Sequence, residues 1–376
     1  MHVTQVGFHA DPQRRDPDRL LEAWPTLAAV AAAAVRAGVE TTVVQAAADD
    51  AQRERDGVHY IFVREPTPTR VHRKLGYWAS PGGQRTAQHA LTTNADVLHV
   101  HGLGFPRQLE QVAGAAPILI QDHGDRPPSR WVTPLWRRAL THAAGIAFTA
   151  REQALPFVEA GLLARDTPVF EVLESSTTFT PGNRGEARRH IGMHGEPCCL
   201  WLGNLDVNKD PLVALAAFEC VAETLSHAHL WMCWQSGPLL GAVRERVASS
   251  VVLRNRVHLL GALPHADVEL ALRAADFLLQ ASHREGSGYA VLEALACGTT
   301  PIVTDIPSFR RITCSGAVGA LFRTGDVNGM ARALVTLSAY DSTLLRSQAR
   351  QHFEANLAFD AVGRELLAAY TQVASS

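Results

Sequence analysis

The sequence predicts an α/β protein built from two doubly wound, parallel-sheet domains. The chain has 376 residues, which is more than one typical hydrophobic core. Short apolar runs alternate with helical stretches in both halves, and this alternation indicates parallel sheets covered by helices. Between the halves lies a polar segment with Pro and Gly, residues 175–185, which is typical of a linker.

Apolar runs predict strands in the first half at Val3–Phe8, Glu40–Gln45, Tyr60–Val63, Ala95–His101, Pro117–Gln121, Gly145–Thr149 and Val169–Val172. In the second half they predict strands at Cys198–Leu202, His229–Trp234, Val257–Leu260 and Asp276–Ala281, with another beginning at Pro301. The helical stretches include residues 20–37, in which Pro25 marks either a kink or a true start.

Composition excludes several function classes. With 35 basic and 37 acidic residues, the chain has no net field that would favour nucleic acid. No apolar run approaches the ~20 residues of a membrane span, and the N-terminus begins a strand instead of a signal peptide, so we expect a cytoplasmic protein. The six cysteines form no CxxC pair, which favours buried, reduced thiols over a zinc site.

One stretch carries most of the chemistry. After a predicted strand comes Glu285, then a glycine loop, then a helix that contains Glu293. The free N–H groups at a helix N-terminus bind anions, and Gly286 and Gly288 let a ligand approach the backbone closely. This arrangement suits a diphosphate, while the two carboxylates suit sugar hydroxyls. A nucleotide sugar has that shape; the alternative is a solvated helix with two incidental acids.

The stretch resembles the donor site of retaining glycosyltransferases of family 4, which have the GT-B fold. Their Glu-x7-Glu pattern stands here as Glu285-Gly-Ser-Gly-Tyr-Ala-Val-Leu-Glu293, followed by Ala-Cys-Gly and the next strand. The resemblance implies two Rossmann-like domains facing across a cleft, at residues 1–178 and 179–358, and a last helix, 359–376, crossing back to the first domain. It implies that Glu285 contacts the transferred sugar and Glu293 the ribose, with Gly286, Ser287, Gly288 and Tyr289 around the donor.

A second segment matches the same family. The family pattern is Gly-Arg-Leu, three residues and Lys; here Gly203, Leu205 and Lys209 match, but Asn204 replaces the arginine. The chain has only two lysines, Lys74 and Lys209, which favours a specific role for Lys209; the alternative is an exposed lysine at a helix start. The resemblance implies that Lys209 stabilises the leaving diphosphate. Asn204 is either a phosphate donor or a turn residue.

The acceptor side is less defined. His123, at a strand end, matches the position where the family often places a histidine facing the donor sugar; a histidine bonded to backbone is the alternative. His101 and Asp125 are further candidates. The first loop has one glycine, Gly7, where many members have a pair, and Arg14 or Arg15 could replace that contact or bind an acidic acceptor; a solvated loop is the equal alternative.

These features predict a metal-independent hexosyl- or N-acetylhexosaminyltransferase that needs no cofactor beyond its nucleotide-sugar substrate. A UDP-sugar is favoured over a GDP-sugar on frequency alone. The acceptor is open: a glycan, a lipid-linked molecule or a small molecule. Residues 126–138 carry Trp and Arg side chains that suit peripheral contact with the inner membrane surface, although packing inside the first domain is favoured. A non-catalytic nucleotide-sugar-binding protein and a nucleotide-sugar epimerase are the alternatives.

Overall fold

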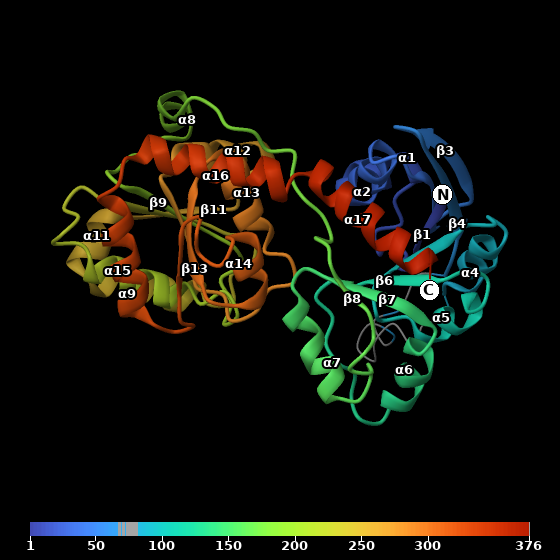
Figure 1. The fold of residues 1–376 in the computed structure, drawn as a ribbon. Helices are drawn as coiled ribbons and strands as arrows, with labels where there is room; N and C mark the ends of the chain where they lie inside the picture. Colours follow the sequence, from blue (N-terminus) through green and yellow to red (C-terminus); the bar gives the residue numbers. More distant parts are fainter. Residues whose placement is uncertain (67–68, 70–71, 73–81, 376) are drawn as a thin grey trace. The chain divides into compact units, whose positions relative to one another are not determined.

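A computed structural model describes residues 1–66, 69, 72 and 82–375, so Lys74 lies outside the described residues. It divides into two compact units (Figure 1). Unit 1 comprises residues 1–176 and 359–376, and unit 2 comprises residues 177–358. Each unit contains one sheet with helices packed against it, which confirms the predicted α/β class.

Unit 1 holds an eight-stranded sheet in the order β3-β4-β2-β1-β5-β6-β7-β8, parallel except for the β3–β4 pair. The strands are β1 (His2–Gly7), β2 (Glu40–Ala47), β3 (Ala51–Arg55), β4 (Val58–Arg64), β5 (Val97–His101), β6 (Ile118–Gln121), β7 (Ala143–Phe148) and β8 (Val169–Glu171). The helices are α1 (Pro17–Ala23), α2 (Pro25–Arg36), α4 (Gln84–Leu91), α5 (Pro106–Val112), α6 (Thr133–Leu140), the 3-10 helix η2 (Arg151–Ala154), α7 (Leu155–Glu159) and α17 (Phe359–Ala374).

Proline placement explains where the first helices begin. Pro25 is the first residue of α2, so the predicted stretch 20–37 is two helices with the break at Trp24. The last helix, α17, packs against α2 within unit 1. A Cβ at Gly363 would lie 2.3 Å from the carbonyl oxygen of Ala33, so glycine is what permits this close approach.

Unit 2 holds a six-stranded parallel sheet in the order β11-β10-β9-β12-β13-β14. The strands are β9 (Cys198–Leu202), β10 (His229–Cys233), β11 (Val257–Gly261), β12 (Phe277–Gln280), β13 (Thr300–Thr304) and β14 (Ala320–Phe322). The helices are α8 (Arg184–Ile191), α9 (Pro211–Cys220), α10 (Leu240–Ser249), α11 (Val251–Arg256), α12 (His265–Ala274), α13 (Tyr289–Cys297), α14 (Pro307–Ile312), α15 (Val327–Ser338) and α16 (Ser342–Asn356).

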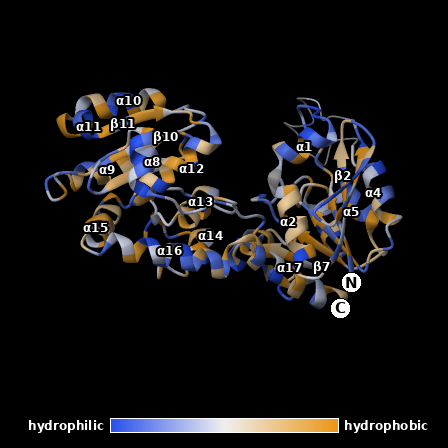
Figure 2. Cartoon of the chain, turned by 90° about the horizontal axis from the view of Figure 1, so that it is seen from above, coloured by the Kyte–Doolittle hydropathy of each residue, from blue (hydrophilic) through white to orange (hydrophobic). Residues whose placement is uncertain are grey.

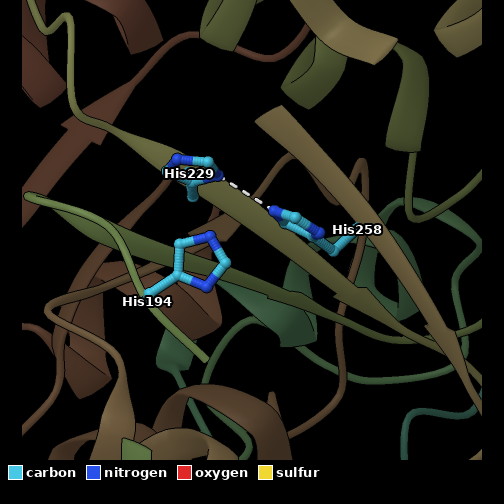
Figure 3. Close-up of side chains that lie close together, drawn as sticks. All are labelled: His194, His229 and His258. Atoms are coloured by element: carbon cyan, nitrogen blue, oxygen red, sulfur yellow. Dashed lines mark hydrogen bonds between the residues drawn. The ribbon is translucent and has the colours of Figure 1, made fainter. Parts of the chain in front are cut away.

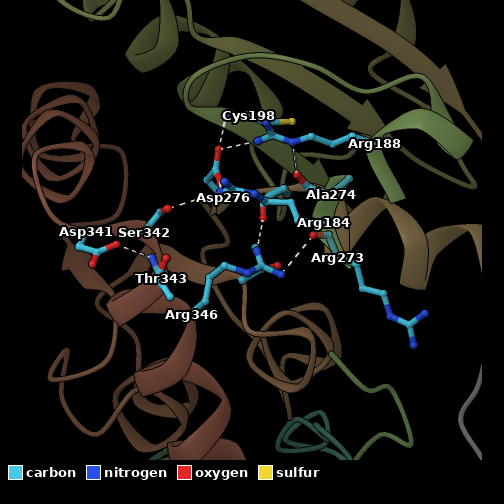
Figure 4. A network of polar contacts seen from close by, with 12 residues as sticks. Arg184, Arg188, Cys198, Arg273, Ala274, Asp276, Asp341, Ser342, Thr343 and Arg346 are labelled. Atoms are coloured by element: carbon cyan, nitrogen blue, oxygen red, sulfur yellow. Dashed lines mark hydrogen bonds and ion pairs between the residues drawn. The ribbon is translucent and has the colours of Figure 1, made fainter. Parts of the chain in front are cut away.

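The sheet of unit 2 lies between apolar layers, with Trp201 of β9, Phe218 of α9 and Leu279 of β12 fully buried. Figure 2 shows α8, by contrast, as a largely hydrophilic helix. Two arginines of α8 reach Asp276, which precedes β12: Arg184 lies 2.5 Å and Arg188 2.8 Å from its carboxylate (Figure 4). This network holds a polar surface helix against the amino end of β12.

The expectation that the cysteines are buried is wrong for two of the six. Cys198, Cys199, Cys233 and Cys297 are buried, but Cys220 and Cys314 are exposed. Cys220 is the last residue of α9, and Cys314 lies in the turn after α14, so both sit where a helix meets solvent. All six are free thiols. None of the described helices has the length and apolar character needed to cross a membrane.

Candidate active site

The donor-side residues lie at the switch point of the second sheet. Strands β9 and β12 are neighbours in space but lead to strands on opposite sides, β10 and β13. In open parallel sheets ligands bind at such a point, outside the carboxyl ends of the strands. The two loops that leave this edge are residues 203–210 and 281–288, and they carry the residues that the sequence selected.

Lys209 and Glu285 meet there. The Lys209 ammonium lies 2.5 Å from the Glu285 carboxylate, and both side chains are largely buried, at 22% and 11% exposed. The stem of Lys209 passes 3.5 Å from where a Cβ on Gly203 would lie, so the lysine packs along the start of this loop. The structure therefore brings together the lysine and the glutamate of the two separate motifs.

The helix that follows begins without a side-chain cap. Gly288 precedes α13 with φ +64, and a Cβ there would lie 2.7 Å from the Phe309 ring, so both backbone and space require glycine. The loop of Gly286 and Ser287 thus leads directly into the amino end of α13, where helix N–H groups favour an anion. Tyr289, the first helical residue, is 40% exposed.

Glu293 is the fifth residue of α13, about one turn from its start. Burial raises the pKa of its carboxyl from 4.5 to about 7. Desolvation is the only cause, since no charged neighbour offsets it. Near neutral pH the side chain is therefore divided between its two protonation states.

The acceptor-side histidines also lie at a carboxyl edge, in unit 1. His101 ends β5 and His123 follows β6; His101 Nδ1 is 3.1 Å from His123 Nε2. The other ring nitrogen of His123 is 2.5 Å from Glu174, a residue that the sequence analysis did not select. Glu174 follows β8, so its position at the same edge of the sheet was the available signal.

Glu174 sets the charge of His123. Burial alone would lower the pKa of the His123 imidazole, but the hydrogen bond and charge of Glu174, with those of Asp125 and Asp122, raise it overall. His101 behaves oppositely: burial, and then His99 and His123, hold its pKa well below 6.5. The pair thus combines one imidazole that readily carries a proton with one that stays neutral.

Asp125 and Asp122 shape the loop after β6. Asp125 accepts a hydrogen bond from the backbone N–H of Leu103 at 2.8 Å, so it ties this loop to the one after β5. Asp122, which the sequence analysis did not select, accepts from the N–H groups of Gly124 and Asp125. Burial, and then the charge of Asp125, raise the pKa of Asp122 to about 7. Asp125 is hence placed mainly to order the loop.

The sequence of this chain is similar to those of known glycosyltransferases. A family profile described as "Glycosyl transferases group 1" matches residues 196–339, which include both donor loops. Over these residues the chain is similar to the family 4 glycosyltransferases. It is 30% identical over 264 residues to a D-inositol 3-phosphate glycosyltransferase of Geodermatophilus obscurus, covering 67% of this chain and 57% of that protein. It is 23% identical over 256 residues to a GDP-mannose:cellobiosyl-diphosphopolyprenol alpha-mannosyltransferase of Xanthomonas oryzae pv. oryzae, covering 66% of each.

The fold is shared along the whole chain. The sucrose-phosphate synthase of Thermosynechococcus elongatus superposes with a TM-score of 0.69 at 18% identity, covering all of both chains. This likeness confirms the GT-B fold. The matches to the two curated relatives span less than two thirds of their length, at 57% and 66%.

Of the two departures from the family 4 pattern, Asn204 has a structural account. Asn204 Oδ1 accepts a hydrogen bond from the backbone N–H of Ser236 at 3.2 Å, so this side chain braces the loop after β10. Its amide nitrogen is the group that can still donate to a ligand. In the first loop, a Cβ on Gly7 would lie 2.0 Å from Gln45 Oε1, so Gly7 lets this side chain pack against the backbone; nothing in the structure explains the missing second glycine.

The arginines of the first loop differ in role. Arg15 lies 3.1 Å from Asp11, a carboxylate that also accepts from the backbone of Gln13 and Arg15. Arg14 is exposed, has the left-handed φ of 52, and lines a surface pocket with Arg15 and Arg19. Arg14 is consequently the arginine of this loop whose side chain faces solvent.

Residues 126–138, the segment that suits membrane contact, contain one buried and one exposed tryptophan. Trp136 is buried and its indole donates to the carbonyl of Leu103 at 2.8 Å, as packing inside the first domain predicts. Trp131 is 94% exposed. Arg138 pairs with Glu110, and Arg137 donates a hydrogen bond to the carbonyl of Gly161. Both guanidinium groups are therefore engaged within unit 1.

Proposed function

We propose that this chain is a retaining glycosyltransferase that moves a hexosyl or N-acetylhexosaminyl group from a nucleoside-diphosphate sugar to an acceptor. The observation that carries the proposal is the Lys209–Glu285 pair beside the uncapped start of α13. A lysine and a helix N-terminus supply positive charge for a diphosphate, and a carboxylate beside them accepts hydrogen bonds from a sugar.

Charge development in the reaction explains the roles of these groups. As the bond between sugar and phosphate breaks, negative charge grows on the diphosphate, and Lys209 and the N–H groups of α13 stabilise it there. They do the work that a divalent cation does in other transferases, so the donor site has no need of one. The departing phosphate oxygen takes the proton of the attacking hydroxyl on the same face, and the anomeric configuration is retained.

Glu285 and Glu293 recognise the two sugars of the donor. Glu285, released from Lys209 when the diphosphate binds, accepts from hydroxyls of the transferred sugar, and Glu293 accepts from the ribose. His123, held by Glu174, is a positively charged donor for the transferred sugar or the acceptor. Arg14 and Asp125 lie on the acceptor side.

The identity of the nucleotide in the donor and the identity of the acceptor are separate questions. Frequency favours UDP, whereas the Xanthomonas relative is named for GDP-mannose and a lipid-linked acceptor. A lipid-linked acceptor would give the exposed Trp131 a role at a membrane surface, where an indole ring is stable.

The testing experiment is calorimetric titration of UDP, GDP and ADP into the wild type and into Lys209→Ala. We expect one nucleotide to bind, and its affinity to fall when Lys209 is removed. Binding of no nucleotide would contradict the proposal. The same nucleotide as its sugar conjugate, with a pool of glycan and lipid-linked acceptors, should then yield nucleotide and a product of unchanged anomeric configuration.

A non-catalytic binding protein is the second candidate, and Asn204 favours it. The family's arginine brings a full charge and a two-pronged donor to the diphosphate, and the oxygen of Asn204 is instead engaged with Ser236. This candidate predicts tight nucleotide-sugar binding with no release of nucleotide on adding any acceptor. Introducing Asn204→Arg should raise turnover if the chain is an enzyme.

A further inference from the structure

Three histidines gather at the amino-terminal edge of the second sheet (Figure 3). His229 is the first residue of β10, His258 is the second of β11, and His194 lies in the loop before β9. One ring nitrogen from each lies within 4.8 Å of the other two. Because the strands are parallel, this edge is opposite the one that carries Lys209 and Glu285, so the cluster is no part of the donor site.

Strand register explains why the three rings meet. Trp231 pairs with His258 across β10 and β11, and His229 lies two residues before Trp231, so the three side chains share one face of the sheet. The Trp231 ring stacks on His258 with centroids 3.8 Å apart. Its indole N–H donates to the carbonyl of His194 at 2.9 Å, which holds the loop over the same face.

We propose that His194, His229 and His258 form a binding site for a divalent transition metal of the zinc class, with one coordination position open to solvent. Imidazole nitrogen is a preferred ligand of Zn²⁺, Ni²⁺ and Cu²⁺. Tetrahedral zinc at about 2.0–2.1 Å from each nitrogen needs ligand nitrogens about 3.3 Å apart. The observed separations, 2.9 Å for His229 Nδ1 to His258 Nε2 and at most 4.8 Å overall, lie on both sides of that value.

The surroundings support a metal over a purely aromatic cluster. His229 and His258 satisfy each other with one hydrogen bond, but the third ring, His194, brings another basic nitrogen to the same point. Among the described residues no carboxylate joins this group to balance a proton on it. His194 is exposed, so a metal can enter from solvent and keep a water molecule as its fourth ligand.

One nearby charge moderates the affinity. Arg256, at the end of α11, lies close enough to disfavour positive charge on His229. Its guanidinium donates to the carbonyls of Ala222 and Leu225, which fixes it there. We therefore expect a site of micromolar affinity, not the tighter binding typical of structural zinc sites with cysteine ligands.

A bound metal would join three segments of unit 2: the loop before β9, β10 and β11. Because binding to the folded state alone stabilises that state, Zn²⁺ at a hundred times its Kd should raise the melting temperature of unit 2 by about 5 to 10 °C. The donor edge would be unaffected.

The test uses the full chain without a histidine tag, freed of metal with a chelator that is then removed. Zn²⁺ alone is titrated by calorimetry, and Co²⁺ binding is followed by its visible absorption, which reports coordination geometry. We expect one saturable site in the wild type. His194→Asn and His258→Gln should each weaken it at least about tenfold.

The matched control is His227→Asn, an exposed histidine in the same region that is not part of the cluster. It should bind Zn²⁺ like the wild type. His194 lies in an exposed loop, so its replacement should leave the far-UV spectrum and the nucleotide affinity unchanged. Absence of saturable Zn²⁺ binding in the wild type, or equal affinity in His194→Asn and His227→Asn, would overturn the proposal whatever the outcome at the donor site.

Discussion

Replacing Glu293 by Gln should stabilise the protein and weaken its donor binding at once. Burial raises the pKa of this carboxyl from 4.5 to about 7, a shift of about 2.5 units, so its ionisation in the folded state costs about 3 kcal/mol. Glutamine has the same shape and no charge. It removes that cost, but it also removes an ionised acceptor for the ribose hydroxyls.

The sign of the pH dependence follows from linkage. The folded-state pKa lies above the unfolded one, so the wild type is fully stable below about pH 4.5 and loses stability as the pH rises to about 7. Glu293→Gln and the wild type should therefore unfold alike at pH 4.5. At pH 8.5 the variant should be more stable by about 3 kcal/mol, or about 6 to 12 °C in melting temperature for a unit of this size.

The assay is thermal unfolding at both pH values together with calorimetric binding of the nucleotide sugar, which has no titrating phosphate in this range. Wild-type binding should weaken as pH falls below 7, because the ligand needs the ionised carboxylate, and Glu293→Gln should lose that dependence. Glu245→Gln, at an exposed position on α10, should change neither property. Equal stability of wild type and Glu293→Gln at pH 8.5 would refute the burial argument, and unchanged binding would refute the ribose contact.

Three further substitutions separate the roles of the remaining groups. Lys209→Ala should weaken nucleoside-diphosphate binding about 10- to 100-fold by calorimetry, since charge-assisted hydrogen bonds are lost, yet leave nucleoside binding unchanged; equal loss of both would indicate a different site. Glu285→Ala should abolish transfer, measured as nucleotide release with acceptor, while nucleotide binding persists; retained transfer would rule out a sugar-facing role. Glu174→Gln should lower the pKa of His123 and move the alkaline limb of the pH–rate profile to lower pH, because the protonated imidazole is the active form; an unmoved limb, when His123→Asn does reduce the rate, would mean that Glu174 does not tune this histidine.

The fold class was predictable because its signal is redundant. Buried parallel strands read as apolar runs, and most of the predicted strands agree with the observed ones to within a few residues. Strand β3 was missed because its sequence, Ala-Gln-Arg-Glu-Arg, is almost wholly exposed. Charged residues on an edge strand oppose aggregation and at the same time remove the pattern that reveals a strand.

The donor loops were found by motif, but the contacts within them were not. Loops 203–210 and 281–288 are far apart in sequence, and only the neighbouring positions of β9 and β12 bring Lys209 to Glu285. The same holds for Glu174 and His123, which lie after β8 and β6. No spacing rule reports such pairs, since their distance depends on strand order.

The Lys209–Glu285 contact changes how the donor site should be understood. Each motif alone assigns its residue to the ligand, but in the structure the ammonium and the carboxylate neutralise each other in a largely buried setting. Neither charge is left buried alone, which would be costly. A diphosphate that takes Lys209 must release Glu285, and the transferred sugar offers hydroxyl donors in its place. If Lys209 and Glu285 hold the donor as proposed, donor binding is an exchange of partners, and a nucleotide without a sugar completes only half of it.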